Sequence, residues 1–363
     1  MITISLCMIV KNEEDVIIRC LESVKGVADE IILVDTGSND NTKALAAPYV
    51  DAIYDFSWID DFSAARNYAF SKATKDYCMW IDADDILTAE NRNALIQLKD
   101  TLPPETDVVM LRYNTAFDEA GNPTFSYYRE RIVRNSSAYR WQGRVHEVIT
   151  PSGRVVYADI AVTHHKLHAG DTDRNLRIYR RQIAQGESLS PRDQFYFARE
   201  LYYHKLYEEA AAEFRRFLAE GGGWLENNIE SCRFLAYCLY AQGKDDEALS
   251  ALLHSLIYDS PRAECCCDIG RHFLERNACQ QAVFWYELAL NRPRDDTTGA
   301  FVNPDCYGFL PCIQLCVCWD RLGNVQQAAA YNERAGSYKP ESPAYLYNRE
   351  YFRRKAEDNG AFG

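Results

Sequence analysis

The chain has 363 residues, of which 47% are hydrophobic and 26% are charged, a mixture typical of globular proteins and unlike that of disordered chains. Its 53 acidic residues outnumber the 40 Lys and Arg, which gives a formal net charge of −13. From this length we expect about two to three domains. Because such an acidic surface repels the phosphates of nucleic acids and anionic lipids, we expect no nucleic-acid partner.

Residues 1–10 lack the basic region and cleavage site of a signal peptide. Their apolar pattern predicts a strand instead. No apolar run approaches the ~18 residues that a membrane span needs. We therefore expect a cytoplasmic protein without a transmembrane segment. The thirteen cysteines lie mostly within helical patterns, which predicts reduced and buried thiols rather than disulfides or a zinc site.

The first ~110 residues alternate apolar runs with amphipathic stretches, a pattern that predicts an α/β domain with a mainly parallel sheet. Strands are expected at 2–10, 30–34, 52–54 and 77–81, and helices at 14–24, 40–47 and 63–74. In an open sheet of this kind, ligands bind beyond the carboxyl ends of the strands. The polar residues that follow three of these strands are Asn12, Glu13, Asp35, Asp82 and Asp84.

From residue 108 to about residue 162 the pattern changes to short strand-like segments, which we assign to the second half of the same domain. These segments are 108–113, 131–133, 145–149 and 160–162. Turn-forming residues, Gly121 to Pro123, separate the first two.

After about Pro191 the strand pattern stops and helix pairs begin. The second helices of four pairs align on Ala210, Ala248, Ala282 and Ala328. The spacing between the first three alanines is close to the period of about 34 residues of a helical repeat. The longer spacing between the last two predicts an insertion there. The pattern resembles tetratricopeptide (TPR) repeats, in which stacked helix pairs bury a continuous core.

The strongest local signal for chemistry is the segment Trp80 to Asp85, where an apolar strand leads into Asp82, Asp84 and Asp85. Magnesium and manganese are commonly bound by one or two carboxylates together with substrate phosphates. A capped helix N-terminus would explain Asp84 or Asp85 but not the whole group. The segment therefore predicts a divalent-cation site.

Two other polar positions lie near the same expected edge of the sheet. Asp35 ends its strand and can accept hydrogen bonds from a base or a ribose hydroxyl, whereas Asp40 is explained by helix capping. Arg66 lies on the following helix, where its guanidinium either reaches a phosphate or forms a surface ion pair.

Four motifs, in their order and spacing along the chain, resemble those of the family 2 glycosyltransferases of the GT-A fold. They are Ser5 to Glu13, Val34 to Asp40, Ala65 to Ala69 and Trp80 to Asp85. The resemblance covers about the first 170 residues. Together with the helical repeats, it is similar to the bacterial subgroup that includes the peptide S-glycosyltransferases of glycocin biosynthesis.

The resemblance implies a donor site for a nucleotide-diphosphate sugar, expected to be UDP-linked. Arg66 is implied to lie near this donor, and Asp84, with Asp82, is implied to hold Mn²⁺ or Mg²⁺. The residues implied to bind the nucleotide sugar are Ile9, Val10, Lys11, Asn12, Glu13, Asp35, Arg66, Asp82 and Ala83. Many relatives carry Tyr where this chain has Lys11, so stacking on the base is not expected there.

The acceptor side is implied by the segment Trp141 to Glu147, which matches a Val-His-Glu element of the subgroup. Family members invert the anomeric centre, which requires a base for the acceptor's proton. We expect Glu147 to be this base, with Asp85 and His146 as alternatives, while a structural strand-end pair also explains His146 and Glu147.

Related enzymes often add a histidine to the metal ligands. We favour His165 over His164 as this metal ligand in the present chain, and His168 is a further candidate. A structural histidine is the other explanation. The loop from residue 166 to residue 174 is expected to close over the donor, with Gly170 as its hinge.

Together with these patterns, the resemblance implies a metal-dependent inverting glycosyltransferase of the hexosyltransferase type, with a catalytic domain at residues 1–175 and a TPR-like domain at residues 176–363. Its partners are expected to be a nucleotide sugar and an acceptor peptide, protein or glycan, and the repeat domain offers a surface for a homodimer. The alternative is a non-catalytic TPR interaction protein with a degenerate nucleotide-binding domain. Nucleotidyl transfer is disfavoured, because the N-terminus lacks a glycine-rich phosphate loop with lysine.

Overall fold

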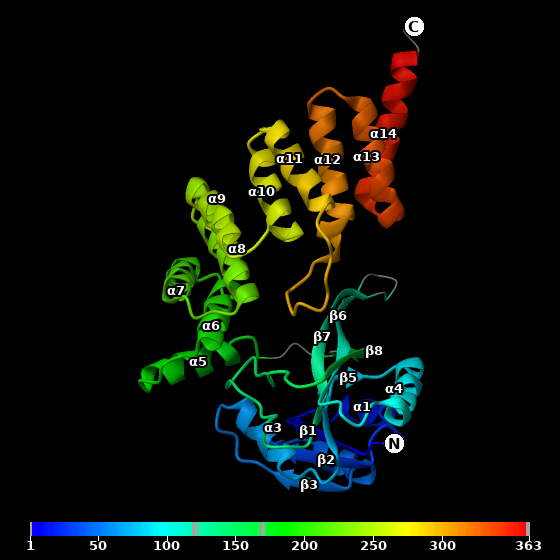
Figure 1. Cartoon of the computed structure of the whole chain (residues 1–363), viewed down its shortest axis with the longest axis vertical. Coiled ribbons are helices and arrows are strands. Elements are labelled where there is room, and N and C mark those ends of the chain that lie inside the picture. The colour runs from blue at the N-terminus through cyan, green and yellow to red at the C-terminus, as the bar shows by residue number, and fades with distance from the viewer. Residues whose placement is uncertain (1, 118–120, 122, 166, 168–170, 361–363) are drawn as a thin grey trace. The chain divides into compact units, whose positions relative to one another are not determined.

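The computed structural model describes residues 2–117, 121, 123–165, 167 and 171–360 (Figure 1). The chain divides into two compact units, Met1–Asp193 and Gln194–Gly363. The domain boundary between residues 175 and 176 stays a prediction, because a unit defined by packing need not end where a catalytic domain ends. Among the described residues, no helix has both the length and the apolar character needed to cross a bilayer.

The first unit is built on one eight-stranded sheet with the order β3-β2-β1-β4-β7-β6-β8-β5. Its strands are β1 (Ile4–Val10), β2 (Glu30–Asp35), β3 (Ala52–Asp55), β4 (Tyr77–Trp80), β5 (Asp85–Ile86), β6 (Val108–Phe117), β7 (Pro123–Arg134) and β8 (Val155–His164). Its helices are α1 (Ile17–Ser23), α2 (Thr42–Ala46), η1 (Ala47–Tyr49), α3 (Phe62–Phe70), α4 (Ala89–Thr101) and α5 (Arg174–Ala184).

The N-terminal half of the sheet is parallel, as predicted for an α/β domain. β1 pairs in parallel with β2 and β4, and β2 with β3. The register pairs Val10 with Asp35 and Cys7 with Trp80, so the carboxyl ends of three strands meet at one edge. This edge is where the predicted site residues gather.

The second half of the sheet is mixed. β7 pairs antiparallel with both β4 and β6, whereas β6 and β8 are parallel. The prediction of a strand at 145–149 is wrong: the described residues there form only an isolated bridge, between Gln142 and Val148. Gly143 and His146 have φ angles of 91° and 51°, and left-handed backbone interrupts an extended strand.

Both faces of the sheet are covered, which explains why its strands read as continuous apolar runs. On one face, Ile17 of α1 and Leu95 of α4 pack with Leu6 and Met8 of β1. On the other face, Phe70 of α3 packs with Val34 and Trp80. The strands are therefore anchored by a core on each face of the sheet, which fixes the edge where β1, β2 and β4 end.

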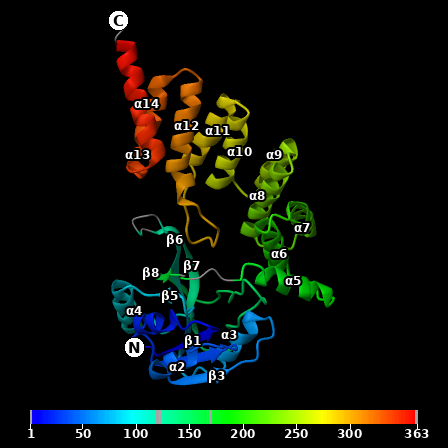
Figure 2. The same cartoon turned by 180° about the vertical axis from the view of Figure 1, so that it is seen from behind.

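The second unit consists of stacked helix pairs. After α6 (Pro191–Tyr203), which crosses the division, its helices are α7 (Tyr207–Glu220), α8 (Leu225–Ala241), α9 (Asp245–His254), η2 (Ser255–Ile257), α10 (Ala263–Glu275), α11 (Cys279–Leu290), η3 (Pro304–Tyr307), α12 (Phe309–Arg321), α13 (Val325–Tyr338) and α14 (Pro343–Gly360). Figures 1 and 2 show α10 beside α11 and α12 beside α13 from both sides.

The alanine register predicted the second helix of every pair. Ala210, Ala248, Ala282 and Ala328 lie near the starts of α7, α9, α11 and α13, and each is 0% exposed. A small residue at this point lets the paired helices approach closely. The predicted insertion lies between α11 and α12, and the thirteen cysteines are buried free thiols.

Candidate active site

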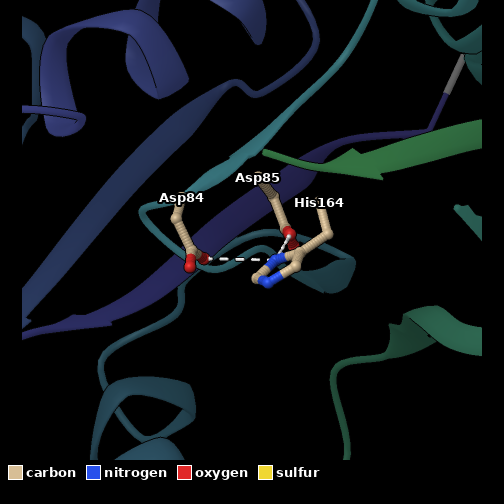
Figure 3. A group of neighbouring side chains, drawn as sticks. All are labelled: Asp84, Asp85 and His164. Atoms are coloured by element: carbon tan, nitrogen blue, oxygen red, sulfur yellow. Dashed lines mark hydrogen bonds and ion pairs between the residues drawn. The ribbon is translucent and has the colours of Figure 1, made fainter. Parts of the chain in front are cut away.

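A cluster of carboxylates lies at the carboxyl end of β4. All four residues of this strand are buried, so the sheet anchors the strand and the following residues emerge at the edge where β1 and β2 also end. Figure 3 shows Asp84 and Asp85 beside the ring of His164, which comes from the end of β8. One imidazole and two carboxylates thus come together from segments that are distant in the sequence.

Asp85 is completely buried, and both of its oxygens are engaged. Oδ1 accepts a hydrogen bond from the Tyr113 hydroxyl at 2.9 Å and lies 3.2 Å from His164 Nδ1. Oδ2 lies 3.2 Å from Nη1 of the equally buried Arg131 and accepts from the backbone N–H of Asp82 at 3.2 Å. This carboxylate is therefore satisfied entirely by the protein.

Asp84 is more accessible than its neighbour. Its side chain is 24% exposed, and Oδ1 lies 3.6 Å from His164 Nδ1. Burial raises the pKa of Asp84 above its usual value, Asp82 and Asp85 raise it further, and His164 opposes them. The hydrogen bond to Asp85 raises the pKa of His164 against the effect of burial.

The donor atoms of this group suit a divalent cation. Ligand atoms of Asp84, Asp85 and His164 lie within 4.8 Å of one another, the one such group of three among the residues that the structure describes. Carboxylate oxygens suit Mg²⁺ and Mn²⁺, and imidazole nitrogen is a common additional ligand for transition metals. Asp84 and His164 therefore fit the cation that the sequence predicts.

His165 has a different environment from His164, because successive side chains of an extended segment point to opposite sides. Its Nδ1 lies 2.9 Å from Arg19 Nη1, and its carbonyl accepts from Arg19 Nη2 at 2.8 Å. The structure brings His164, and not His165, to the carboxylates. His168 and Gly170, with the core of the expected closing loop, lie outside the described residues.

Arg66 joins the two sides of the site. Its side chain is 8% exposed and its guanidinium lies 5.0 and 4.9 Å from the ring centroids of Trp80 and Trp141. Nη2 donates to Asp82 Oδ1 at 2.8 Å and Nε donates to Glu147 Oε1 at 2.6 Å. Nη1 is buried and has no hydrogen-bond partner. Arg66 therefore does form ion pairs, but they are buried rather than at the surface.

Arginine also controls the ionisation of Asp82. Burial alone would raise the pKa of Asp82, but Arg66 and then Arg131 outweigh burial and lower it. A third of the Asp82 side chain remains exposed. Asp82 is therefore held ionised and within reach of a ligand at the edge of the sheet.

The two acceptor-side candidates are placed by a loop rather than by the predicted strand. Glu147 is 12% exposed, its Oε1 is held by Arg66, and its carbonyl accepts from Arg129 Nη2 at 3.4 Å. His146 has left-handed backbone, and its carbonyl accepts from Arg192 Nη2 at 3.1 Å. Glu147 is thus joined to Asp82 through Arg66.

The predicted nucleotide-binding residues line the ends of β1 and β2. Asp35 is buried: Oδ2 accepts from the backbone N–H groups of Gly37 and Ser38, whereas Oδ1 has no hydrogen-bond partner. Asn12, with a φ of 55°, accepts from Asn39 N–H through Oδ1. A buried, unsatisfied carboxylate oxygen is costly unless a ligand donates to it.

The remaining predicted residues differ in accessibility. Lys11 is exposed, Ile9 and Glu13 are half-buried, and Val10 and Ala83 are buried in the core. The Val10 side chain therefore supports the sheet, and a ligand at this edge can meet only its backbone. Glu13 N–H donates to Thr42 Oγ1 at 2.7 Å, which ties the loop after β1 to α2.

Two residues of the site were not among the residues predicted from the sequence. Tyr113 and Arg131 lie within strands β6 and β7, in stretches where most neighbouring residues are also buried, so neither is set apart as a polar residue at a strand end. An arginine within an apolar strand, 131–133, is the one hint, because a buried arginine needs an acidic partner.

Comparison with known proteins identifies the family that the first unit resembles in sequence. Residues 5–161 match the family model described as glycosyl transferase family 2. These residues form a glycosyl transferase family 2 domain. The match includes all four motifs of the predicted donor site and both strands that supply Tyr113 and Arg131. Together with the observed helix pairs, it confirms the predicted combination of a family 2 domain with helical repeats.

Known proteins are similar to parts of this chain. The TPR repeat-containing protein Synpcc7942_0270 of Synechococcus elongatus is 40% identical over 154 residues, which cover 42% of this chain and 36% of the relative. The SPbeta prophage-derived glycosyltransferase SunS of Bacillus subtilis is 30% identical over 222 residues, covering 57% of this chain and 51% of SunS.

The lipopolysaccharide core biosynthesis glycosyltransferase LpsC of Rhizobium meliloti is 30% identical over 168 residues, which cover 42% of this chain and 58% of LpsC. The matched regions thus span between 36% and 58% of these relatives. The family match and these homologues support glycosyl transfer as the general chemistry of the domain.

Proposed function

We propose that the chain is a metal-dependent inverting glycosyltransferase, which moves a sugar from a UDP-linked donor to the side chain of a peptide or protein, or to a glycan. Residues 1–175 would form the catalytic domain and residues 176–363 the repeat domain. The observation that carries the proposal is the link from Asp82 through Arg66 to Glu147, at the edge of the sheet that also holds Asp35 and Asp84.

On the donor side, Asp35 offers its unsatisfied Oδ1 to an N–H or O–H of the nucleoside. Asp84 and His164 would hold Mn²⁺ or Mg²⁺, with Asp82 nearby. When bound, the cation stabilises the negative charge of the departing diphosphate. The residues of the chain place the donor so that the far side of its anomeric carbon faces the acceptor.

On the acceptor side, Glu147 is the proposed base. Arg66 fixes Oε1, so Oε2 is the atom that takes the proton from the acceptor hydroxyl or thiol. The acceptor oxygen or sulfur then forms the new bond to the anomeric carbon, and the bond to the diphosphate breaks with its electron pair on the leaving oxygen. A thiol acceptor needs less help from the base than a hydroxyl, because its pKa is lower.

The test is release of UDP from a panel of UDP sugars, with Mn²⁺, with Mg²⁺ and with EDTA. We expect cation-dependent release with at least one donor, and a loss of at least about 100-fold in kcat for Asp84→Asn. Asp159→Asn is the matched control, because Asp159 is 86% exposed in an ion pair with Arg112. UDP release at the same rate with and without EDTA contradicts the proposed cation site. Release at the wild-type rate by Asp84→Asn contradicts it as well.

A further inference from the structure

The starting observation is that Asp85, unlike Asp84, has no oxygen left for a ligand. An ionised carboxylate has about four lone-pair positions. Tyr113 and His164 take Oδ1, and Arg131 and the Asp82 N–H take Oδ2. A cation or an acceptor proton could reach Asp85 only after one of these partners had left.

The partners of Asp85 are held as firmly as Asp85 itself. Arg131 is 0% exposed, lies 3.8 Å from the Trp80 ring centroid, and also donates to the Trp80 carbonyl at 3.4 Å. Tyr113 is buried on β6, and its ring lies 5.9 Å from that of His164. Asp85 is therefore fixed by two strands that run beside β4 and β8.

The contact with Asp85 also determines the proton on His164. His164 Nδ1 lies 3.2 Å from Asp85 Oδ1 and 3.1 Å from the Tyr113 hydroxyl oxygen. Because Asp85 is paired with Arg131 and already accepts from Tyr113, a neutral His164 satisfies these acceptors by carrying its hydrogen on Nδ1. In this neutral form of the ring, Nε2 keeps the lone pair. Metal-binding histidines commonly have their second nitrogen fixed by a carboxylate in this way, and such partners influence metal affinity strongly.

From these contacts we infer that Tyr113 and Arg131 are positioning residues, which act through Asp85 to hold His164 with Nε2 free to bind the divalent cation beside Asp84. The inference rests on the proposed function for the identity of the cation site. It assigns Asp85 neither to the base nor to the cation ligands. It also adds two residues that no sequence motif indicated.

The test measures Mn²⁺ binding to the full chain by the loss of the free-ion EPR signal, with and without UDP. Tyr113→Phe keeps the ring and removes the hydroxyl, and we expect it to weaken Mn²⁺ affinity by about 10-fold. Tyr77→Phe is the control: Tyr77 is also buried in this sheet, and its hydroxyl donates to the Thr106 carbonyl at 2.7 Å. We expect Tyr77→Phe to leave Mn²⁺ affinity unchanged.

Equal Mn²⁺ affinity in wild type and Tyr113→Phe overturns the inference, as does an equal loss in both variants. Arg131→Lys is a second variant, expected to weaken Mn²⁺ binding at least as much, with circular dichroism as the check of folding. Absence of Mn²⁺ binding in the wild type overturns the inference as well. Tyrosine-dependent Mn²⁺ binding without turnover of any UDP sugar supports the inference and counts against the proposed function.

A second readout is the tautomer of His164. In protein labelled with ¹⁵N-histidine and saturated with Mg²⁺ and UDP, we expect a pyrrole-type Nδ1 and a pyridine-type Nε2, with His164→Gln assigning the signals. Tyr113→Phe should broaden these signals or mix the two tautomers. A wild-type spectrum in which Nε2 carries the proton contradicts the inference.

Discussion

At the scale of single residues, the site depends on arginines that lie between carboxylates. Arg66 reaches Asp82 and Glu147 with two different nitrogens, while two tryptophan rings hold its guanidinium plane. Lysine has one ammonium group and cannot reproduce this fork. The side chain that the sequence placed near the donor thus also determines where the proposed base lies.

We expect Arg66→Lys to lower kcat for sugar transfer by about 100-fold, because misplacement of a catalytic group by about 1 Å has an effect of this size. The measurement is steady-state release of UDP. Arg154→Lys is the control, since Arg154 is half-exposed in its ion pair with Glu105. Equal activity of the two variants would show that Arg66 does not position Glu147.

A pH dependence follows from Glu130, which is buried and paired with Arg129. Burial alone would raise the pKa of Glu130, but Arg129 and the Ile149 N–H lower it below the usual value. A group with a lowered folded-state pKa stabilises the fold above its unfolded pKa of about 4.3, and this contribution is lost as the pH falls through the folded-state value.

The predicted result is that Glu130→Gln is less stable than wild type at pH 7, and that the difference narrows as the pH falls below about 4.3. Urea unfolding of both proteins between pH 3 and pH 7 measures this difference. A difference that stays constant over the whole range would mean that the ionised form of Glu130 contributes nothing to stability.

At the scale of elements, close helix packing in the second unit depends on small residues. Gly270 in α10 faces Tyr286 in α11, and a Cβ at Gly270 would lie 2.9 Å from the Tyr286 ring. Tyr286 is 1% exposed and has little room to move. Packing and helix propensity therefore make opposite predictions for an alanine at this position.

We expect Gly270→Ala to destabilise the chain by about 1–2 kcal/mol, because overpacking costs about 1–3 kcal/mol and exceeds the gain of at most about 1 kcal/mol from helix propensity. Chemical denaturation monitored by circular dichroism measures this. Ser250→Ala, at an exposed position in α9, should instead be neutral or slightly stabilising. A stabilised Gly270→Ala would show that α10 and α11 can separate without cost.

At the scale of the whole molecule, each compact unit has its own core. Leu6, Met8 and Leu95 belong to a core of the first unit, and Cys266 and Leu315 to a core of the second. Repeat arrays are stabilised mainly by contacts between neighbouring repeats. The contacts between helix pairs of the second unit therefore supply most of the stabilisation that this unit needs to fold.

Residues 188–363, expressed alone, are expected to be helical by circular dichroism and to unfold cooperatively with heat. A fragment that starts at residue 268 divides α10 and removes the partner surface of the later repeats, so it should lose this cooperativity. Failure of the longer fragment to fold would show that the second unit depends on the first.

Several features of this protein were determined by the sequence alone, because they depend on local patterns. Apolar runs and helical spacing located the four strands before residue 82, and the recurring alanines located every second helix of the repeats. The same local patterns placed Asp35, Asp82 and Asp84 at strand ends. The segment 145–149 was predicted to be a strand but forms a loop, because Gly143 and His146 adopt left-handed backbone. The pattern of apolar residues does not reveal such backbone angles.

Only the tertiary structure decided which side chains meet at the site. Tyr113, Arg131 and His164 reach Asp85 because the sheet order places β7, β6 and β8 between β4 and β5. The choice of His164 over His165 likewise depends on which face of β8 turns toward the carboxylates. Such contacts join residues 28 to 79 positions apart, so strand pairing, and no local sequence pattern, brings them together.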